Sequence, residues 1–210
     1  YLRARYYNPT IGRFTQEDVY RGDGLNLYTY VINNPLLWID PSGYAKCSQV
    51  LLRGDSDIYA TVNEKGIRKS YITDEGNLTP ANLEGTYTIK KKPNEIKNVT
   101  VAQHILGGYR KKAKDNSPFT SFSFKQSIAN KYFHKTTIEV DISRLRKDIQ
   151  TGKVTNVAIL SPKRIKQLIN DDSTQTDYWK KRALKWTQRD GEYLIKGEIP
   201  KEFIKIRKEE

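Results

Sequence analysis

Hydrophobic and polar positions follow two different patterns along this chain, and the change falls near residue 45. Residues 1–44 alternate aromatic and polar side chains in short runs, which Gly and Asn-Asn-Pro turns separate. That alternation predicts β-hairpins with one Tyr-lined face. After residue 45, short apolar runs typical of strands stand between stretches whose apolar residues recur at helical spacing. We therefore predict an α+β fold with mainly antiparallel strands for residues 45–210.

The individual elements of the second region are predicted from period, length and flanking turn residues. Within residues 161–170, for example, Ser161 is placed to cap a helix and Pro162 to open its first turn. The predicted helices lie at residues 99–114, 125–133, 161–170 and 176–190, and the predicted strands at 48–55, 70–73, 86–92, 116–124, 136–142, 154–160 and 192–208.

Charge divides the chain at the same place. The 210 residues carry 37 Lys and Arg against 24 Asp and Glu, a formal net charge of +13. Residues 1–44 contribute four bases and four acids, so residues 45–210 hold all of the excess. The change falls within NNPLLWIDPSGYAKC, residues 33–47, and predicts two domains, 1–44 and 45–210. A basic domain suggests a polyanionic partner (nucleic acid, an acidic protein or a membrane surface), although a Lys-rich soluble surface explains the charge equally well.

Cysteine, histidine and apolar content argue against several classes of site. Cys47 is the single cysteine, so no intrachain disulfide can form and a cysteine metal site is not expected. The two histidines, His104 and His134, lie far apart in the sequence and argue against a histidine metal centre. No apolar run approaches the ~20 residues of a membrane span. The chain opens in mid-pattern, without Met or a signal peptide, which is typical of a fragment of a longer protein.

The first 44 residues carry motifs of a known family. YLRARYYNPTIGRFTQED, GLNLYTYVINNP and LLWIDPSGY together resemble the C-terminal end of the RHS (rearrangement hotspot) repeat-associated core. The resemblance implies that these residues end a shell of YD repeats, which encloses a toxin formed by the following residues. It also implies self-cleavage at Tyr44–Ala45 by an aspartate pair, for which Asp18 and Asp40 occupy the matching positions. Tyr44 stands where the family has Leu, and Val19 stands where it has Pro.

The chemistry of such a pair is reasonable. Two carboxylates that share a proton can activate a water molecule for attack on a peptide bond, one as base and one as acid. The alternative is that residues 40–43, Asp-Pro-Ser-Gly, form only a turn, since Asp and Pro suit the first two positions of a type I turn. The surrounding repeat match makes self-cleavage our prediction.

Three short stretches of the second region resemble a second family. They are LLRGDS at 51–56, SPFTSFSF at 117–124, and DGEYLI at 190–195 followed by Gly197 and Ile199-Pro200. In this order they resemble the Arg–Ser–Glu signature of NAD-dependent ADP-ribosyltransferases of the cholera and heat-labile enterotoxin type. This resemblance covers about residues 48–206 and implies a split β-sandwich with helices. The family often carries Glu or Gln two residues before its catalytic Glu. This chain has Asp190 at that position, which puts transfer to arginine in doubt.

The resemblance implies a role for each motif residue. Breaking the glycosidic bond of NAD builds oxocarbenium charge on the ribose, as in sugar hydrolysis. A carboxylate at the ribose 2′-hydroxyl stabilises that charge, and we assign this role to Glu192. Arg53 offers a charged fork to the phosphates or the adenine-side ribose, while Ser121 holds the Glu192 carboxylate. The predicted catalytic residues are thus Glu192, Ser121 and Arg53, and the predicted NAD-binding residues are Arg53, Gly54, Ser121, Phe122 and Ser123, with Phe119 beside them.

Plainer roles compete with these assignments. Arg53 could form an ion pair with a neighbouring acid, and the serines of residues 117–124 could be the polar face of an edge strand. Glu198 competes with Glu192, which we prefer because it stands at the family's interval from Gly197.

Together the two resemblances predict an antibacterial RHS toxin. A bacterial delivery system would secrete it, and residues 45–210 would transfer ADP-ribose from NAD to RNA or protein in the recipient cytoplasm. The expected partners are the RHS shell, the target and a cognate immunity protein, which we expect to be acidic. Residues 176–189, TDYWKKRALKWTQR, interleave bases with two Trp in a way that suits RNA. The same stretch also fits an amphipathic helix with its Trp side chains in the core.

Two other functions stay open from the residues alone. A metal-independent RNase would suit a basic cargo of an RHS protein, and it would need a His or Lys acid–base pair. His104 and His134 are the only histidine candidates, and His104 lies on an apolar helix, where a lone histidine is more often structural. The other function is a binding module without chemistry, such as a plug of the shell.

Overall fold

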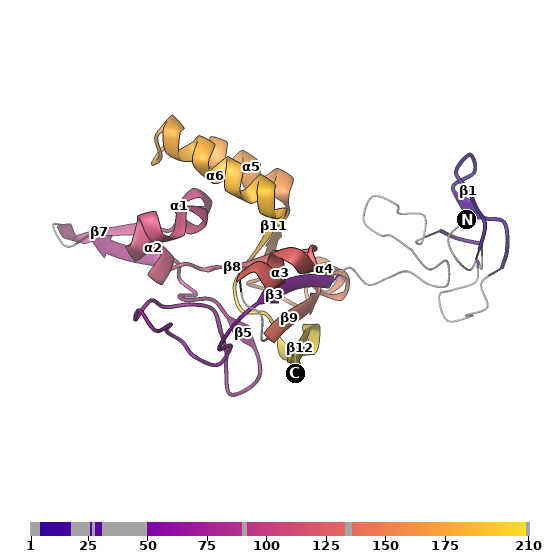
Figure 1. The fold of residues 1–210 in the computed structure, drawn as a ribbon, viewed down its shortest axis with the longest axis horizontal. Coiled ribbons are helices and arrows are strands. Elements are labelled where there is room, and N and C mark those ends of the chain that lie inside the picture. The colour runs from indigo at the N-terminus through magenta and orange to yellow at the C-terminus, as the bar shows by residue number, and fades with distance from the viewer. Residues whose placement is uncertain are drawn as a thin grey trace. The chain divides into compact units, whose positions relative to one another are not determined.

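The computed structural model divides the chain into two compact units, Tyr1–Gln49 and Val50–Glu210 (Figure 1). The function that we assign to each predicted domain stays a prediction. The aspartate pair and the cleavage site, Asp18, Asp40 and Tyr44–Ala45, lie outside the described residues, so self-cleavage also stays a prediction. The structure describes residues 5–17, 26, 28–30, 50–89, 92–132 and 136–208.

A small hairpin with an aromatic face stands in the first unit. Strands β1 (Tyr7–Asn8) and β2 (Arg13–Phe14) pair antiparallel. Phe14 is buried, and the ring centroids of Tyr7 and Tyr30 lie 6.1 and 5.5 Å from its own. The Arg5 guanidinium lies over the same ring, 3.7 Å from its centroid. The aromatic alternation thus supplies the side chains that bury Phe14.

A six-stranded antiparallel sheet forms the centre of the second unit, in the order β10-β11-β8-β3-β9-β12. The order places β3 next to β8, and β8 next to β11, so the three predicted motifs lie on neighbouring strands. Whether this sheet is a split β-sandwich of the ADP-ribosyltransferase type stays a prediction. The strands are β3 (Val50–Gly54), β8 (Phe119–Ser123), β9 (Thr136–Asp141), β10 (Ala158–Leu160), β11 (Glu192–Lys196) and β12 (Ile204–Lys208).

Helices and two small hairpins surround this sheet. Figure 1 shows α5 and α6 side by side, with α1 close to them and β11 leading away from their end. The helices are α1 (Val101–Leu106), α2 (Lys111–Asp115), α3 (Gln126–Tyr132), α4 (Ile142–Gln150), α5 (Pro162–Asn170) and α6 (Asp177–Asp190), with 3₁₀ turns at Gly107–Arg110 and Lys201–Phe203. The hairpins pair β4 (Tyr71–Ile72) with β5 (Leu78–Thr79), and β6 (Thr86–Ile89) with β7 (Lys92–Asn98).

Two hydrophobic clusters lie on opposite faces of the sheet, and strand alternation separates them. On β8, Phe119 belongs to the cluster that α1, α5 and α6 cover, and Phe122 belongs to the other. On β11, Leu194 and Ile195 divide in the same way. Ser121 follows the parity of Phe119, and therefore lies on the face that the three helices cover.

Local signals fix the ends of the helices beside the site. Thr100 and Gln103 form a capping box at the start of α1, with the Thr100 hydroxyl accepting from the Gln103 amide over 3.2 Å. Gly191 ends α6 in the left-handed conformation (φ 57°), which a glycine adopts without steric cost. Glu192 follows at once as the first residue of β11, so the helix end sets the position of this carboxylate.

The structure departs from the predicted elements in several places, and strand β5 and most of β7, for example, were not predicted. The predicted helix at residues 99–114 is α1, a 3₁₀ turn and α2, because Gly107 takes a positive φ of 51°. Helix α4 was not predicted, because its sequence follows the apolar strand β9 without a turn residue. Asp141 ends that strand and caps the helix, accepting from the amides of Ser143 and Arg144.

Candidate active site

The sheet opens between β3 and β8. These strands share one register pair, Leu52 with Ser123, whereas β8 pairs with β11 over five positions. At Ser121, β8 has no strand partner on the β3 side, and Arg53 Nη1 donates to the Ser121 carbonyl over 3.3 Å instead. A cavity of about 560 Å³ opens at this gap, and its wall includes Arg53, Ser121 and Glu192. Three residues separated by more than sixty positions each are therefore brought to one place.

Arg53 is held from behind by a buried acid. Asp55 is 1 % exposed, and its carboxylate lies 3.5 Å from Arg53 Nη2 and 2.8 Å from Lys69 Nζ. One end of the guanidinium thus binds Asp55 and the other binds the Ser121 carbonyl. Arg53 Nε is buried and has no hydrogen-bond partner among the described residues. The plainer alternative, an ion pair with a neighbouring acid, is present, and it orients Arg53 at the cavity.

A short chain of hydrogen bonds leads to Ser121. His104 Nδ1 lies 2.6 Å from Ser117 Oγ, and His104 Nε2 lies 2.9 Å from Ser121 Oγ. Burial, with the nearby charges of Arg53 and Lys114, lowers the pKa of His104 to about 3, so the ring is neutral at the pH of a cell. A neutral imidazole has one donor and one acceptor nitrogen. If Nε2 donates to Ser121, the Ser121 hydroxyl proton is directed to the next acceptor, and Nδ1 accepts from Ser117.

That next acceptor is Glu192. Glu192 stands opposite Ser123 in the β8–β11 register and has the parity of Leu194, so its side chain lies on the Ser121 face. Burial raises the pKa of Glu192 to about 7, and the Asp190 charge adds to the rise. A hydrogen bond from Ser121 and the Arg53 charge oppose it. The carboxyl thus exchanges its proton near neutral pH, as a group that acts in acid–base or charge-stabilising chemistry must.

The remaining predicted NAD-binding residues border the same cavity, but two of them have other tasks. Gly54, Phe122 and Ser123 all line it. Phe122 is 3 % exposed and packs in the cluster on the opposite face of the sheet. The Ser123 hydroxyl donates to the Asp190 carbonyl over 2.8 Å and accepts from the Lys125 amide, which joins the end of α6 to β8. Their contact with NAD stays a prediction.

Glu198, the competing carboxylate, lies elsewhere. Its Oε1 accepts from Asn77 Nδ2 over 3.1 Å, and its Oε2 accepts from the Thr79 hydroxyl. It does not line the cavity that holds Glu192. Glu198 therefore fastens β5 to the segment after β11, a structural task.

Sequence reasoning gave His104 a structural role, and the structure brings it into the cavity wall. No local sequence signal predicts the contact between His104 and Ser121, because it joins helix α1 to strand β8. Lys69 and its partner Asp55 were also missed as a pair, since the stretch between them has no clear periodicity. His134 lies outside the described residues.

The described residues show neither a metal-binding cluster nor a membrane-spanning helix. They contain no group of three His, Cys, Asp or Glu side chains arranged to hold a metal ion. None of their helices has the length and apolar character needed to cross a membrane.

The raised pKa of Glu192 predicts a pH-dependent cost to stability. Between pH 4.5 and 7 the unfolded chain releases this proton while the folded chain retains it, so stability falls as pH rises through that range. In Glu192→Gln the group carries no such proton. We expect the variant to gain up to about 3 kcal/mol in free energy of unfolding over the parent above pH 7, an upper value because Glu192 is only partly buried and solvent screens its charge.

Urea unfolding of parent and variant across this pH range measures the difference. His104 has the opposite slope, since its lowered pKa makes stability rise with pH between about 3 and 6.5, but it contributes equally to both proteins. A difference that stays constant with pH would show that the Glu192 pKa is not raised.

Comparisons with known proteins give two matches, each to part of the chain. A stretch of 92 residues, 42% of this chain, is 33% identical to a protein named "Probable deoxyribonuclease RhsA" from Dickeya dadantii (strain 3937). A stretch of 85 residues, 40% of the chain, is 33% identical to the uncharacterized protein YibJ of Escherichia coli (strain K12). The chain spans 6% and 35% of the lengths of these relatives. No family model and no solved structure matches it.

Proposed function

We propose that residues 45–210 transfer ADP-ribose from NAD to a macromolecule, RNA or protein. The observation that carries this proposal is the meeting of Arg53, Ser121 and Glu192, from three neighbouring strands, in the wall of one cavity. The partial similarity to RhsA supports the interpretation that the chain is part of an RHS toxin. The relative's name does not support the transferase, so that activity rests on the geometry.

Glu192 would act on the bond between the ribose and nicotinamide. As that bond breaks, its electron pair leaves with nicotinamide, and positive charge develops on the ribose. The Glu192 carboxylate, hydrogen-bonded to the 2′-hydroxyl, would stabilise this charge while a nucleophile of the acceptor forms the new bond and loses its proton. The cationic nicotinamide riboside would itself favour the ionised form of Glu192, since an opposite charge lowers the pKa of a carboxyl.

Basic side chains around the cavity suit a dianionic pyrophosphate. Arg53 presents a buried Nε without a partner among the described residues. Arg68, Lys69, Lys114 and Arg189 line the same wall. Asp55 forms ion pairs with both Arg53 and Lys69 and so holds their side chains in place. Because these side chains are already ordered, binding the phosphates would cost little further conformational entropy.

His104 would act as a positioning residue. Its bond to Ser121 fixes the hydroxyl that lies against Glu192. Because both ring nitrogens are engaged and its pKa is near 3, it is a poor general acid or base.

The second candidate is a nuclease, and the comparisons favour it over the transferase. The observation in its favour is the name of the relative RhsA. The basic cavity would accept a phosphodiester as well as a pyrophosphate. Glu192, with its pKa near 7, would then serve as an acid–base group in place of a His or Lys pair.

One experiment separates the two. The 210-residue chain is incubated with a bacterial lysate and NAD that carries its label in the adenylate moiety, and nicotinamide release is measured. Transfer predicts nicotinamide release with label on RNA or protein. Intact NAD together with degradation of RNA or DNA would reject the transferase and establish the nuclease. Nicotinamide release without label on any macromolecule would indicate an NAD glycohydrolase.

The RHS context adds two parts to the proposal. Cleavage at Tyr44–Ala45, with Asp18 and Asp40, would release the toxin, which a bacterial delivery system would bring to the recipient cytoplasm. A cognate acidic immunity protein would protect the producing cell by covering the basic cavity.

A further inference from the structure

One face of α6 carries aromatic and arginine side chains that the proposed reaction does not use. Tyr178 and Trp179 lie four and three residues before Arg182, and Trp186 lies four residues after it, so these side chains share one face of the helix. Tyr109, from the 3₁₀ turn after α1, packs against them, with its ring centroid 5.2 Å from that of Trp179 and 6.0 Å from that of Trp186. Two segments thus build one surface.

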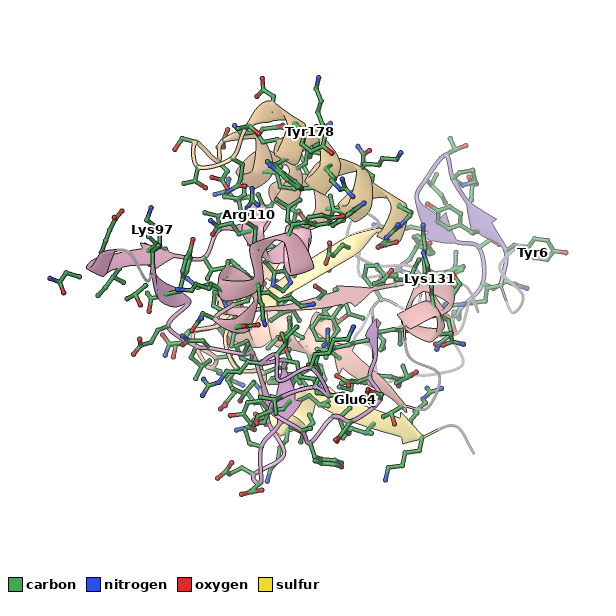
Figure 2. The ribbon with its side chains drawn as sticks, turned by 60° about the vertical axis from the view of Figure 1, so that its left-hand side comes forward. Tyr6, Glu64, Lys97, Arg110, Lys131 and Tyr178 are labelled. Carbon is green, nitrogen blue, oxygen red and sulfur yellow. The ribbon has the colours of Figure 1, made fainter. Side chains whose placement is uncertain are left out.

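Arginine side chains stack between these rings. The guanidinium carbon of Arg182 lies 4.6 Å from the ring centroid of Tyr109 and 5.2 Å from that of Trp186, and Arg110 lies 4.7 Å from that of Trp179. Figure 2 shows Arg110 and Tyr178 on the same side of the second unit, beside the layer of α5 and α6. We call this set the aromatic ledge: Tyr109, Arg110, Tyr178, Trp179, Arg182 and Trp186.

The ledge is not the buried face of the helix. Ala183 and Thr187 occupy that face, with 0% and 3% of their surface exposed. Tyr109 and Tyr178 are 51% and 62% exposed, while the two Trp side chains are half-buried and lean on the cluster beneath. A group of exposed rings is more than this helix needs for packing, and such groups mark binding surfaces.

The positive charge of Lys181, Arg182 and Lys185 favours an anionic partner for the ledge. Among the described residues no carboxylate forms an ion pair with Lys181, Arg182 or Lys185. Within the described part of the chain, Arg182 donates to two hydroxyls, those of Tyr178 (3.1 Å) and Tyr109 (2.8 Å). A polyanion with flat apolar groups would match both the unpaired cations and the rings.

The ledge continues into the cavity. Tyr109 and Trp186 belong to both, and Arg189 at the end of α6 lines the cavity wall. With a rise of 1.5 Å per residue, Trp179 lies about 15 Å along the helix from Arg189. A strand bound along α6 would therefore have one end at the cavity that holds Glu192.

We propose that the aromatic ledge binds single-stranded RNA, with bases stacked on its rings and the backbone beside Lys181 and Lys185. Stacking on exposed aromatic and arginine planes, next to a basic surface, is the chemistry that recognises unpaired bases. RNA is preferred over DNA because cellular RNA offers unstacked bases in loops and ends, whereas duplex DNA does not. The inference goes beyond the proposed function, since such a surface would deliver RNA to either a transferase or a nuclease.

Binding is measured on the full chain in the Glu192→Gln background, without NAD, so that its outcome is independent of the transfer experiment. The probe is a fluorescein-labelled single-stranded RNA of mixed sequence, followed by anisotropy at several salt concentrations. Tyr178→Ala and Arg182→Gln are each expected to weaken binding about tenfold. Affinity should also fall steeply with salt.

Two control variants separate the ledge from general charge and general aromatic surface. Lys181→Gln removes one positive charge from the same helix without removing a ring contact, and we expect a loss of about threefold or less. Tyr59→Ala removes a ring that is 58% exposed but lies on the loop after β3, and should leave affinity unchanged. Equal losses in Arg182→Gln and Lys181→Gln, unaltered binding by Tyr178→Ala, or tighter binding of duplex DNA than of the RNA would each overturn the proposal.

Discussion

Replacing Glu192 with Gln is expected to lower NAD turnover by roughly 10²–10³-fold, the loss that follows removal of one group preorganised for transition-state charge. The amide has nearly the same shape, so the strand pairing with Ser123 and the contact with Ser121 should persist. It cannot carry the negative charge that the developing ribose cation requires. Nicotinamide release under saturating NAD measures the effect, and thermal unfolding near pH 7 should show a variant at least as stable as the parent.

Glu198→Gln is the matched control. It makes the same chemical change six residues along the chain, but at a carboxylate bound to Asn77 and Thr79 outside the cavity. We expect a modest loss of stability and little change in turnover. If the two variants lose turnover equally, the assignment of Glu192 is wrong, and if neither does, the cavity does not perform this reaction.

Replacing Gly197 with Ala is expected to have the largest effect on the fold. Gly197 has a φ of 93°, and an added Cβ would lie 2.1 Å from the carbonyl oxygen of Asn156. The collision is with backbone, which cannot rotate away. Backbone strain and overpacking together should cost about 3–5 kcal/mol, or roughly 10 °C in melting temperature.

Gly152→Ala provides the comparison for strain without collision. Gly152 also has a positive φ, 73°, but nothing lies within 4 Å of an added Cβ. We expect a cost of about 1 kcal/mol from conformation alone. Similar losses in the two variants, measured by urea unfolding, would show that the loop before β10 can move away from Gly197.

Local signals predicted several elements of the site correctly. Helix α5 begins at the Ser161 cap and the following Pro, and α6 ends at Gly191, as their sequences indicate. The alternation of β8 separates Phe122 from Ser121, although sequence reasoning gave both residues one task. Short-range rules succeeded here because a cap, a turn or an alternating strand is decided by neighbours in sequence.

Contacts between distant segments could not be derived in this way. The strand order that sets β3 beside β8 depends on the packing of two clusters, and no stretch of sequence encodes it alone. His104 is the clearest example, because its apolar helical surroundings predict a buried structural residue while both of its ring nitrogens bind serine hydroxyls of another segment. The motif resemblance grouped Arg53, Ser121 and Glu192, and the fold places all three in the wall of one cavity, at a gap in the sheet that the sequence did not predict.

The gap between β3 and β8 affects how the two halves of the sheet are joined. Strands β10, β11 and β8 form one half of the sheet and β3, β9 and β12 the other, and across the divide lie one register pair and the bond from Arg53 to Ser121. A ligand held by Arg53 on one half and Glu192 on the other would act as a tie between them. The hydrophobic cluster with Leu51, Phe122 and Ile195 already joins the two halves, and a ligand that binds only the folded state would add to it and raise the free energy of unfolding by mass action. The cleft is thus a place where chemistry and the integrity of the fold are coupled.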